Sequence, residues 1–250
     1  MQTSAPEVIV CRPQPKGEAL VDDLLACGIQ SVCVPTLLIA PKPYFLDTLQ
    51  GFSDVIFISH NAVHHFFKTN PEYSTAIQPL RVWCVGSGTH KALHDYGINA
   101  VYPQKPGSEG LLAEIEQSSN LQDRHFLLVK GEAGRDLIDQ HLSQVAGSIR
   151  TVECYQRTYM AEDKLKQSIK DAGCIIPPKL MIFTSFDGLK AAMPLFDEYP
   201  EWKYKAAITV TNCRMFNWAK AQGFVKLYII DQFNNDALVE FSCTFLQKGS

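Results

Sequence analysis

Long apolar runs and an N-terminal export signal are both missing from the sequence. No apolar stretch approaches the roughly 20 residues that a helix needs to cross a bilayer. The opening residues, MQTSAPEVIV, do not place a basic segment before a long apolar run, as secretory signals do. We therefore expect a protein that neither spans a membrane nor is secreted.

Strong charge of either sign is also missing. Lys and Arg number 23 against 26 for Asp and Glu, which gives a formal net charge of −3, and no block of basic residues occurs. Proteins that bind nucleic acid or a membrane surface usually carry such a block, so these partners are not expected. An anionic small molecule stays compatible, because a few Arg side chains and backbone N–H groups can outweigh a weak overall field.

Paired cysteine motifs are absent, although the chain contains eight Cys. None of them forms a CxxC pair. Four lie in apolar, strand-like runs, where a reduced thiol packs as a small hydrophobic group: Cys11, Cys33, Cys84 and Cys154. Scattered cysteines of this kind favour reduced thiols in a cytoplasmic protein over a disulfide framework.

The sequence does contain a regular alternation of apolar runs and amphipathic segments along its 250 residues. This alternation predicts βαβ units, with parallel sheets covered by helices on both faces. The expected strands are 8–11, 31–34, 54–58, 81–85, 99–102, 126–129, 149–155, 180–184, 206–210 and 226–230. The expected helices are 16–27, 61–69, 89–96, 109–117, 134–145, 187–196, 214–222 and 236–246.

The two halves of the chain also resemble each other weakly. VIFISHNAVHHFF at 55–67 is similar to MIFTSFDGLKAAM at 181–193, and the segment 8–35 is similar to 127–155. One apolar run therefore ends at Ser59, and its counterpart ends at Thr184 and Ser185. We expect two similar lobes with polar residues at their strand ends, and a ligand site in a cleft between them.

A series of short motifs resembles the uroporphyrinogen-III synthase family over nearly the full chain. Each motif is weak alone, and the signal lies in their order and spacing. The motifs are CRPQ (11–14), CVPTLLI (33–39), FISHNAV (57–63), VGSGTHKAL (85–93), GSEGLL (107–112), VKGEAGRDLIDQHL (129–142), VECYQRTY (152–159), IFTSFDGL (182–189) and TNCRMFNWAKAQG (211–223).

The resemblance implies an α/β fold of two similar lobes, each a parallel sheet flanked by helices, joined by two extended linkers. The first lobe is expected to contain residues 1–37 and 160–250, and the second residues 38–159. The chain would cross between them near Pro35–Thr36 and near Tyr155–Tyr159.

The resemblance also implies a reaction. Hydroxymethylbilane, a linear tetrapyrrole with carboxylate side chains, closes to uroporphyrinogen III with loss of water and inversion of the last ring, which makes the enzyme a hydro-lyase. The pyrrole nitrogens supply the electron push, so no metal or organic cofactor is expected. A cytoplasmic monomer is expected, with a transient contact to hydroxymethylbilane synthase.

Tyr155 matches the tyrosine of a family motif and is the expected catalytic group, because a phenol can donate a hydrogen bond or a proton to a departing hydroxyl. A second interpretation stays open, in which Tyr155 packs at a lobe junction with its hydroxyl in water.

Seven further residues match family positions that would bind substrate. A helix N-terminus at Thr89 favours a carboxylate, although a residue there also serves simply as a helix cap. The arginines suit acetate and propionate groups, but surface ion pairs explain them equally well. The similar turn at Asn212–Met215 departs from the family pattern. The predicted residues are Arg12, Ser59, Asn61, Ser87, Thr89, Arg135 and Ser185.

Other chemistries find little support. His60 and His64 form an HxxxH pair, but no acidic third ligand or Cys pair accompanies them, and His64 and His65 are expected on a helix surface. The GSG at 86–88 is not a nucleotide-binding motif. The alternative function is a two-lobed cytoplasmic protein that binds an anionic small molecule without chemistry.

Overall fold

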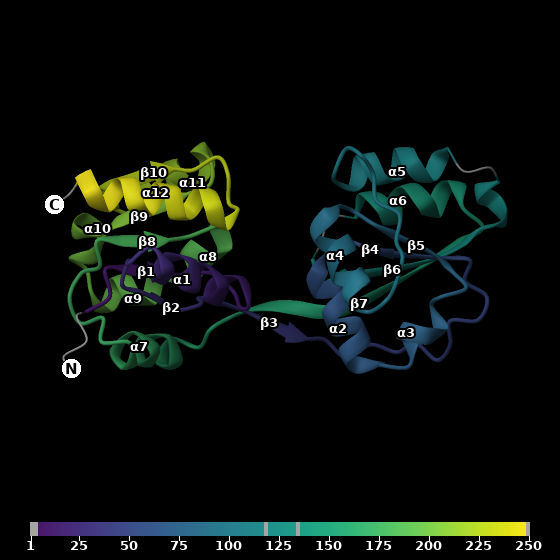
Figure 1. The fold of residues 1–250 in the computed structure, drawn as a ribbon, viewed down its shortest axis with the longest axis horizontal. Coiled ribbons are helices and arrows are strands. Elements are labelled where there is room, and N and C mark those ends of the chain that lie inside the picture. The colour runs from purple at the N-terminus through teal and green to yellow at the C-terminus, as the bar shows by residue number, and fades with distance from the viewer. Residues whose placement is uncertain (1–4, 118–119, 134–135, 249–250) are drawn as a thin grey trace. The chain divides into compact units, whose positions relative to one another are not determined.

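The computed structural model describes residues 5–117, 120–133 and 136–248. Its chain divides into two compact units, and Figure 1 shows that each unit contains a sheet with helices packed against it. The first unit comprises Met1–Leu38 and Thr158–Ser250, and the second comprises Ile39–Arg157. Each unit contains one five-stranded sheet with helices on both faces, so the predicted fold class of two similar α/β lobes is confirmed.

The sheet of the first unit has the order β10-β9-β8-β1-β2, and its strands are parallel. Every residue of β1 is buried, as expected for a central strand covered on both faces. The chain winds from β1 to β2 in one direction and from β8 to β10 in the other, so the winding reverses between β1 and β8. The strands are β1 (Val8–Val10), β2 (Ser31–Cys33), β8 (Leu180–Ile182), β9 (Ala207–Val210) and β10 (Lys226–Ile229).

Two apolar clusters hold the helices of the first unit to its sheet. Helices α1 and α12 cover one face, and α7, α8, α9 and α11 cover the other (Figure 1). The helices are α1 (Lys16–Ala26), α7 (Glu162–Asp171), α8 (Phe186–Ala191), α9 (Met193–Glu198), α10 (Trp202–Lys205), α11 (Cys213–Ala221) and α12 (Asn235–Lys248).

The sheet of the second unit has the order β3-β7-β6-β4-β5. The strands from β7 to β5 are parallel, and the winding reverses between β4 and β6. Helices α2, α3 and α4 cover one face, and α5 and α6 cover the other. The strands are β3 (Leu37–Pro41), β4 (Asp54–Phe57), β5 (Arg81–Cys84), β6 (His125–Gly131) and β7 (Ser148–Tyr159). The helices are α2 (His60–Thr69), α3 (Tyr73–Ala76), α4 (Ser87–Asp95), α5 (Ser108–Glu116), η1 (Leu121–Asp123) and α6 (Leu137–Val145).

The chain passes between the units twice, in β3 and at the end of β7. These two strands are neighbours in the sheet of the second unit. The backbone N–H of Lys42 donates to the carbonyl of Cys154 at 3.0 Å, and the N–H of Met160 donates to the carbonyl of Thr36, also at 3.0 Å. The two segments in which the chain crosses are therefore hydrogen-bonded to each other.

Several predicted elements differ from those found. The expected strand at 99–102 is wrong, since only Val101 forms an isolated bridge, to Trp83. The expected helix at 187–196 is two short helices, α8 and α9. Strand β3 and helices α3, α7 and α10 were not predicted. In the described part of the chain, no helix is long and apolar enough to span a membrane.

Candidate active site

The candidate site lies where the winding of the second sheet reverses. Strand β4 continues through α2 to β5, whereas β6 continues through α6 to β7 on the other side of β4. Adjacent connections that leave in opposite directions open a crevice beyond the carboxyl ends of the two strands. Ser59 follows β4 there, and Gly131 ends β6.

A bulge in β7 directs Tyr155 into this crevice. Lys130 is paired with Glu153, but the next residue, Gly131, is paired with Tyr155, so Cys154 is an extra residue in β7. Successive strand residues normally face opposite sides of a sheet. Here the bulge lets Cys154 and Tyr155 pack into the same apolar cluster, on the face covered by α2. Bulges of this kind often re-aim a side chain beside an active site.

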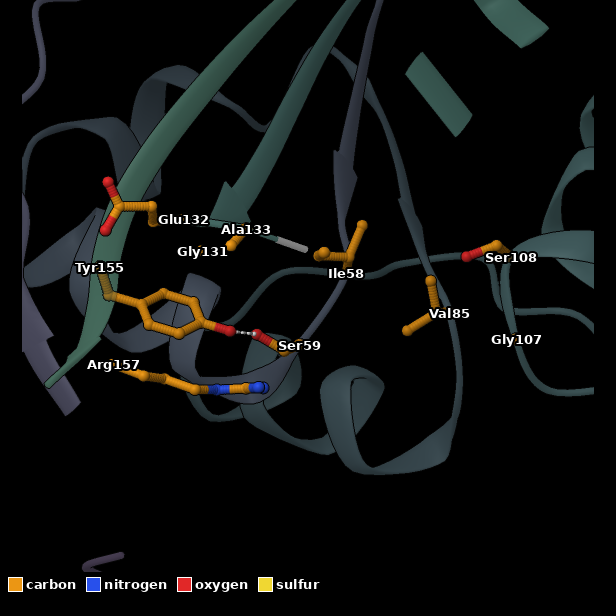
Figure 2. Close-up of a pocket in the computed structure, with 10 residues that line it drawn as sticks. All are labelled: Ile58, Ser59, Val85, Gly107, Ser108, Gly131, Glu132, Ala133, Tyr155 and Arg157. Atoms are coloured by element: carbon orange, nitrogen blue, oxygen red, sulfur yellow. Dashed lines mark hydrogen bonds between the residues drawn. The ribbon is translucent and has the colours of Figure 1, made fainter. Parts of the chain in front are cut away.

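Three neighbours fix the ring of Tyr155, which is only 5% exposed. The ring lies against Gly131, where an added Cβ would come within 2.4 Å of the tyrosine Cζ. The ring of His65 stacks on it, with centroids 5.7 Å apart and an interplanar angle of 25°. The hydroxyl lies 3.0 Å from Oγ of Ser59, the contact drawn as a dashed line in Figure 2.

Ser59 is also the N-cap of α2. Its Oγ accepts a hydrogen bond from the backbone N–H of Ala62 at 3.1 Å, the usual role of serine at this position. Because that bond uses a lone pair and not the hydroxyl proton, Ser59 can still donate to the oxygen of Tyr155. In that arrangement the phenolic proton of Tyr155 is available to another acceptor.

The crevice is a cavity of about 390 Å³, lined by residues of the second unit alone. Tyr155, Ser59 and Arg157 line it together with Val85 and the start of α5 (Figure 2). Its lining is mixed, with apolar side chains beside a phenol, a serine hydroxyl and a guanidinium. Such a lining suits a ligand that is largely apolar but carries polar groups.

The carboxylate in the lining, that of Glu132, is already bound. Nζ of Lys42 lies 2.7 Å from Oε1 of Glu132 and 2.6 Å from Oε2 of Glu153. These hydrogen bonds raise the pKa of Lys42, so it stays cationic. Glu132 is therefore held by Lys42 rather than directed at Tyr155.

Cys154 lies beside Tyr155 but does not have the properties of a nucleophile. Its Sγ lies 3.5 Å from the carbonyl of Ala62 and 3.6 Å from that of Lys130. Burial raises the pKa of the Cys154 thiol to about 12. The reactive thiolate is thus scarce near neutral pH.

Two of the predicted substrate-binding residues lie in the first unit, at its own reversal of winding. Ser185 caps α8 and accepts from the N–H of Gly188 at 3.0 Å. Nη1 of Arg12 donates to Oδ1 of Asn235 at 3.0 Å, and Nη2 donates to the carbonyl of Phe233 at 3.4 Å. Burial lowers the pKa of Arg12.

The other predicted substrate-binding residues have different surroundings. Asn61 and Ser87 are in the first turns of α2 and α4 and do not line the cavity. Thr89 is buried, and the N-cap of α4 is Gly86, so Thr89 is not the cap. Arg135 lies outside the residues that the structure describes.

The histidines near α2 give no metal site. Within the described ranges, no group of three or more His, Cys, Asp or Glu side chains is placed to hold a metal ion. His64 is exposed, as expected. The expectation that His65 lies on the helix surface is wrong, because it is only 9% exposed and packs against Tyr155.

Comparison with known proteins assigns the family. The family profile described as "Uroporphyrinogen-III synthase HemD" matches residues 18–240. The chain belongs to the uroporphyrinogen-III synthase family. Uroporphyrinogen-III synthase of Escherichia coli (strain K12) is 26% identical over 248 residues, which cover 93% of this chain and 98% of that protein. The corresponding protein of Salmonella typhimurium is 25% identical over the same shares of the two chains.

Solved structures of the family share the fold. The structure of uroporphyrinogen-III synthetase from Helicobacter pylori 26695 matches with a TM-score of 0.61 at 18% identity, covering 96% of this chain and 99% of that one. A mutant uroporphyrinogen III synthase from the extremely thermophilic bacterium Thermus thermophilus matches with a TM-score of 0.56 at 15% identity, covering 98% and 100%.

The structure thus brings together two of the predicted site residues, Tyr155 and Ser59, in direct contact. It also identifies three residues that the sequence did not single out as part of a site: Gly131, His65 and Arg157. A sequence signal existed for Arg157, which lies two positions after Tyr155 in the motif VECYQRTY.

Proposed function

We propose that this chain closes hydroxymethylbilane to uroporphyrinogen III, with loss of water and inversion of the last ring. The observation that carries the proposal is a phenol at a reversal of winding, held by Ser59 and Gly131, in a chain of this family. The cavity beside it admits part of a substrate that combines apolar rings with polar groups.

In the proposed reaction, Tyr155 donates to the hydroxyl that leaves the first ring. The nitrogen of that ring pushes electrons toward the carbon as its C–O bond breaks, which gives an azafulvene and, after protonation, water. The substituted carbon of the last ring then attacks, and a spiro intermediate fragments and recloses with loss of a proton. No step needs a cofactor, because the pyrrole nitrogens supply the electrons.

Ser59 keeps the phenol in the useful orientation in this scheme. It donates to the oxygen of Tyr155, so the phenolic proton points to the leaving group and negative charge that develops on the oxygen is stabilised. Positioning a flexible chain contributes as well, since correct placement of reacting groups lowers barriers by up to about 7–11 kcal/mol in model reactions.

The enzyme class and the partners follow from the same proposal. Loss of water makes the enzyme a hydro-lyase, and its partner is a polycarboxylate tetrapyrrole. Action as a cytoplasmic monomer, and a transient contact with hydroxymethylbilane synthase, remain predictions from the resemblance.

The decisive experiment separates isomers. The protein is incubated with freshly made hydroxymethylbilane, and the products are oxidised and resolved into types I and III. An excess of type III over a protein-free control supports the enzyme. Type I alone, at the uncatalysed rate, contradicts the proposal and leaves the alternative of an anion-binding protein without chemistry.

A further inference from the structure

Arg157 enters the cavity through the same bulge that directs Tyr155. Residues two apart on a strand face the same side, so the shift at Cys154 turns both side chains together. Figure 2 shows the Arg157 side chain extending beside the tyrosine ring, with its guanidinium toward Ser59. The cavity therefore presents a neutral phenol and a cation next to each other.

The guanidinium of Arg157 has no ion pair or hydrogen bond to any described residue. Glu132, the carboxylate in the same lining, is bound by Lys42, which also holds Glu153. Arg157 is also the only cationic side chain among the described residues that line the cavity. A cation that no described side chain neutralises is available to an anionic group on a ligand.

We propose that Arg157 binds a carboxylate of the linear tetrapyrrole close to the end of the substrate that meets the hydroxyl of Tyr155. This inference rests on the proposed function. A planar guanidinium forms two parallel hydrogen bonds to a carboxylate, which fixes orientation as well as position. A phenol does not form this paired contact with a carboxylate. Arg157 therefore binds the substrate, and Tyr155 acts on the leaving hydroxyl.

The size of the effect is limited by exposure. Arg157 is exposed, and water and salt weaken exposed ion pairs. For Arg157→Gln we expect KM to rise about ten-fold, which corresponds to about 1.4 kcal/mol. We expect kcat to change much less, because the contact exists in both the ground state and the transition state. Arg157→Lys keeps the charge but not the planar guanidinium, so its KM should lie between that of the wild type and that of Arg157→Gln.

Arg150→Gln is the matched control. Arg150 lies on the same strand and carries the same charge, but its Nη2 donates to the carbonyl of Phe45 at 2.8 Å and its Nη1 lies 3.6 Å from Asp47. It does not line the cavity. Its loss should leave KM and kcat unchanged. The KM of the wild type and of Arg150→Gln should rise with ionic strength more steeply than that of Arg157→Gln.

Three results would overturn the inference: an unchanged KM in Arg157→Gln, an equal rise in KM in Arg150→Gln, or a loss confined to kcat. A binding titration with uroporphyrin, a stable polycarboxylate tetrapyrrole, needs no turnover and serves as a second readout. Arg157→Gln should weaken its binding about ten-fold relative to Arg150→Gln. Absence of type III product from the wild type would instead reject the proposed function, and the titration would still decide the role of Arg157.

Discussion

The two units repeat one strand arrangement but use the ends of their strands differently. Val10 pairs with Cys33 in the first unit as Val129 pairs with Val152 in the second. Arg12 and Gly131 lie two residues beyond the first member of each pair, and Thr36 and Tyr155 lie three residues beyond the second. Arg12 and Thr36 therefore correspond to Gly131 and Tyr155 of the second unit.

Both hydroxyls at this place contact the element that follows the strand two positions away in the sheet, β8 in the first unit and β4 in the second. Oγ1 of Thr36 donates to the carbonyl of Gly188 in α8 at 2.8 Å, and the hydroxyl of Tyr155 meets the hydroxyl of Ser59. A carbonyl only accepts, so Thr36 commits its single proton to structure. A serine hydroxyl both donates and accepts, so Tyr155 can keep its proton for a substrate. The same strand arrangement therefore places a structural hydrogen bond at this position in the first unit and a candidate general acid in the second.

The largest effect should come from removing the hydroxyl of Tyr155. We expect Tyr155→Phe to lower kcat by about 10- to 1,000-fold with little change in folding, because the ring packing is kept. Thr36→Val tests the other side of the comparison. It removes one of two hydrogen bonds to the carbonyl of Gly188, which keeps the N–H of Ala192 at 3.2 Å, and should cost about 0.5–1.5 kcal/mol of stability with kcat near the wild-type value.

Isomer-resolved kinetics and urea unfolding measure the two quantities. If Tyr155→Phe lost stability but not kcat, Tyr155 would be a packing residue like Thr36, and the distinction between the two units would disappear.

Gly131→Ala should have the next largest effect. The added Cβ would lie 2.4 Å from Cζ of the Tyr155 ring, so the ring must move and its contact with Ser59 must lengthen. A displacement of about 1 Å at a catalytic group can cost about 100-fold in rate, and we expect kcat to fall by that order. The double variant Gly131→Ala/Tyr155→Phe should be little worse than either single variant, because both remove the same placed hydroxyl. Additive losses in that double variant would show that Gly131 acts separately from Tyr155.

The two cap serines give a closer test of the comparison. Ser59 and Ser185 each accept from a backbone N–H in the first turn of a helix, and only Ser59 also meets Tyr155. Changing either to Ala should cost about 0.5–2 kcal/mol of stability. Only Ser59→Ala should also lower kcat, by about ten-fold, which corresponds to one lost hydrogen bond of ~1.4 kcal/mol. Equal kcat values in the two variants would mean that Ser59 serves only its helix.

Most strands could be predicted from the sequence because the strands of a parallel sheet that are buried on both faces are continuous apolar runs. Helix α7 could not, since only Leu165 and Ile169 of its residues are buried and its composition is typical of a solvated segment. The segment 99–102 contains strand-forming residues, but a single bridge from Val101 is all that it forms. The spacing of apolar residues indicates which side chains are buried. It therefore does not predict an element that buries few side chains.

The candidate site was predicted in part for a similar reason. Tyr155 and Ser59 were each identified, but their contact depends on the extra residue Cys154, which places two successive side chains on one face. The usual alternation of side chains along a strand assigns Cys154 and Tyr155 to opposite faces, and no residue pattern in the sequence indicates a bulge at this position. Arg157 was overlooked because the expected strand ended at residue 155 and an arginine beyond it is usually a surface charge.

The smallest expected effect concerns pH, where the two units also differ. All seven histidines of the chain lie between residues 60 and 141, within the second unit. Burial lowers the pKa of His65, and the nearby His64 and Lys68 lower it further. In the unfolded chain His65 regains its usual pKa of about 6.5, so near and below that pH the unfolded state binds more protons. The free energy of unfolding is therefore not affected by the titration of His65 above about pH 6.5. It decreases as the pH falls from there toward the lower pKa that His65 has in the folded protein.

His65→Phe keeps an aromatic ring against Tyr155 and removes the titration. Urea unfolding of the wild type between about pH 8 and pH 5 should show a steeper loss of stability on acidification than that of the variant. Comparing the two proteins cancels the contributions of the other six histidines. His94→Gln is the matched control, because His94 is exposed and is not among the groups that lower the pKa of His65. Parallel curves for the wild type and His65→Phe would mean that folding does not lower the pKa of His65, and the pH dependence attributed to this residue would be rejected.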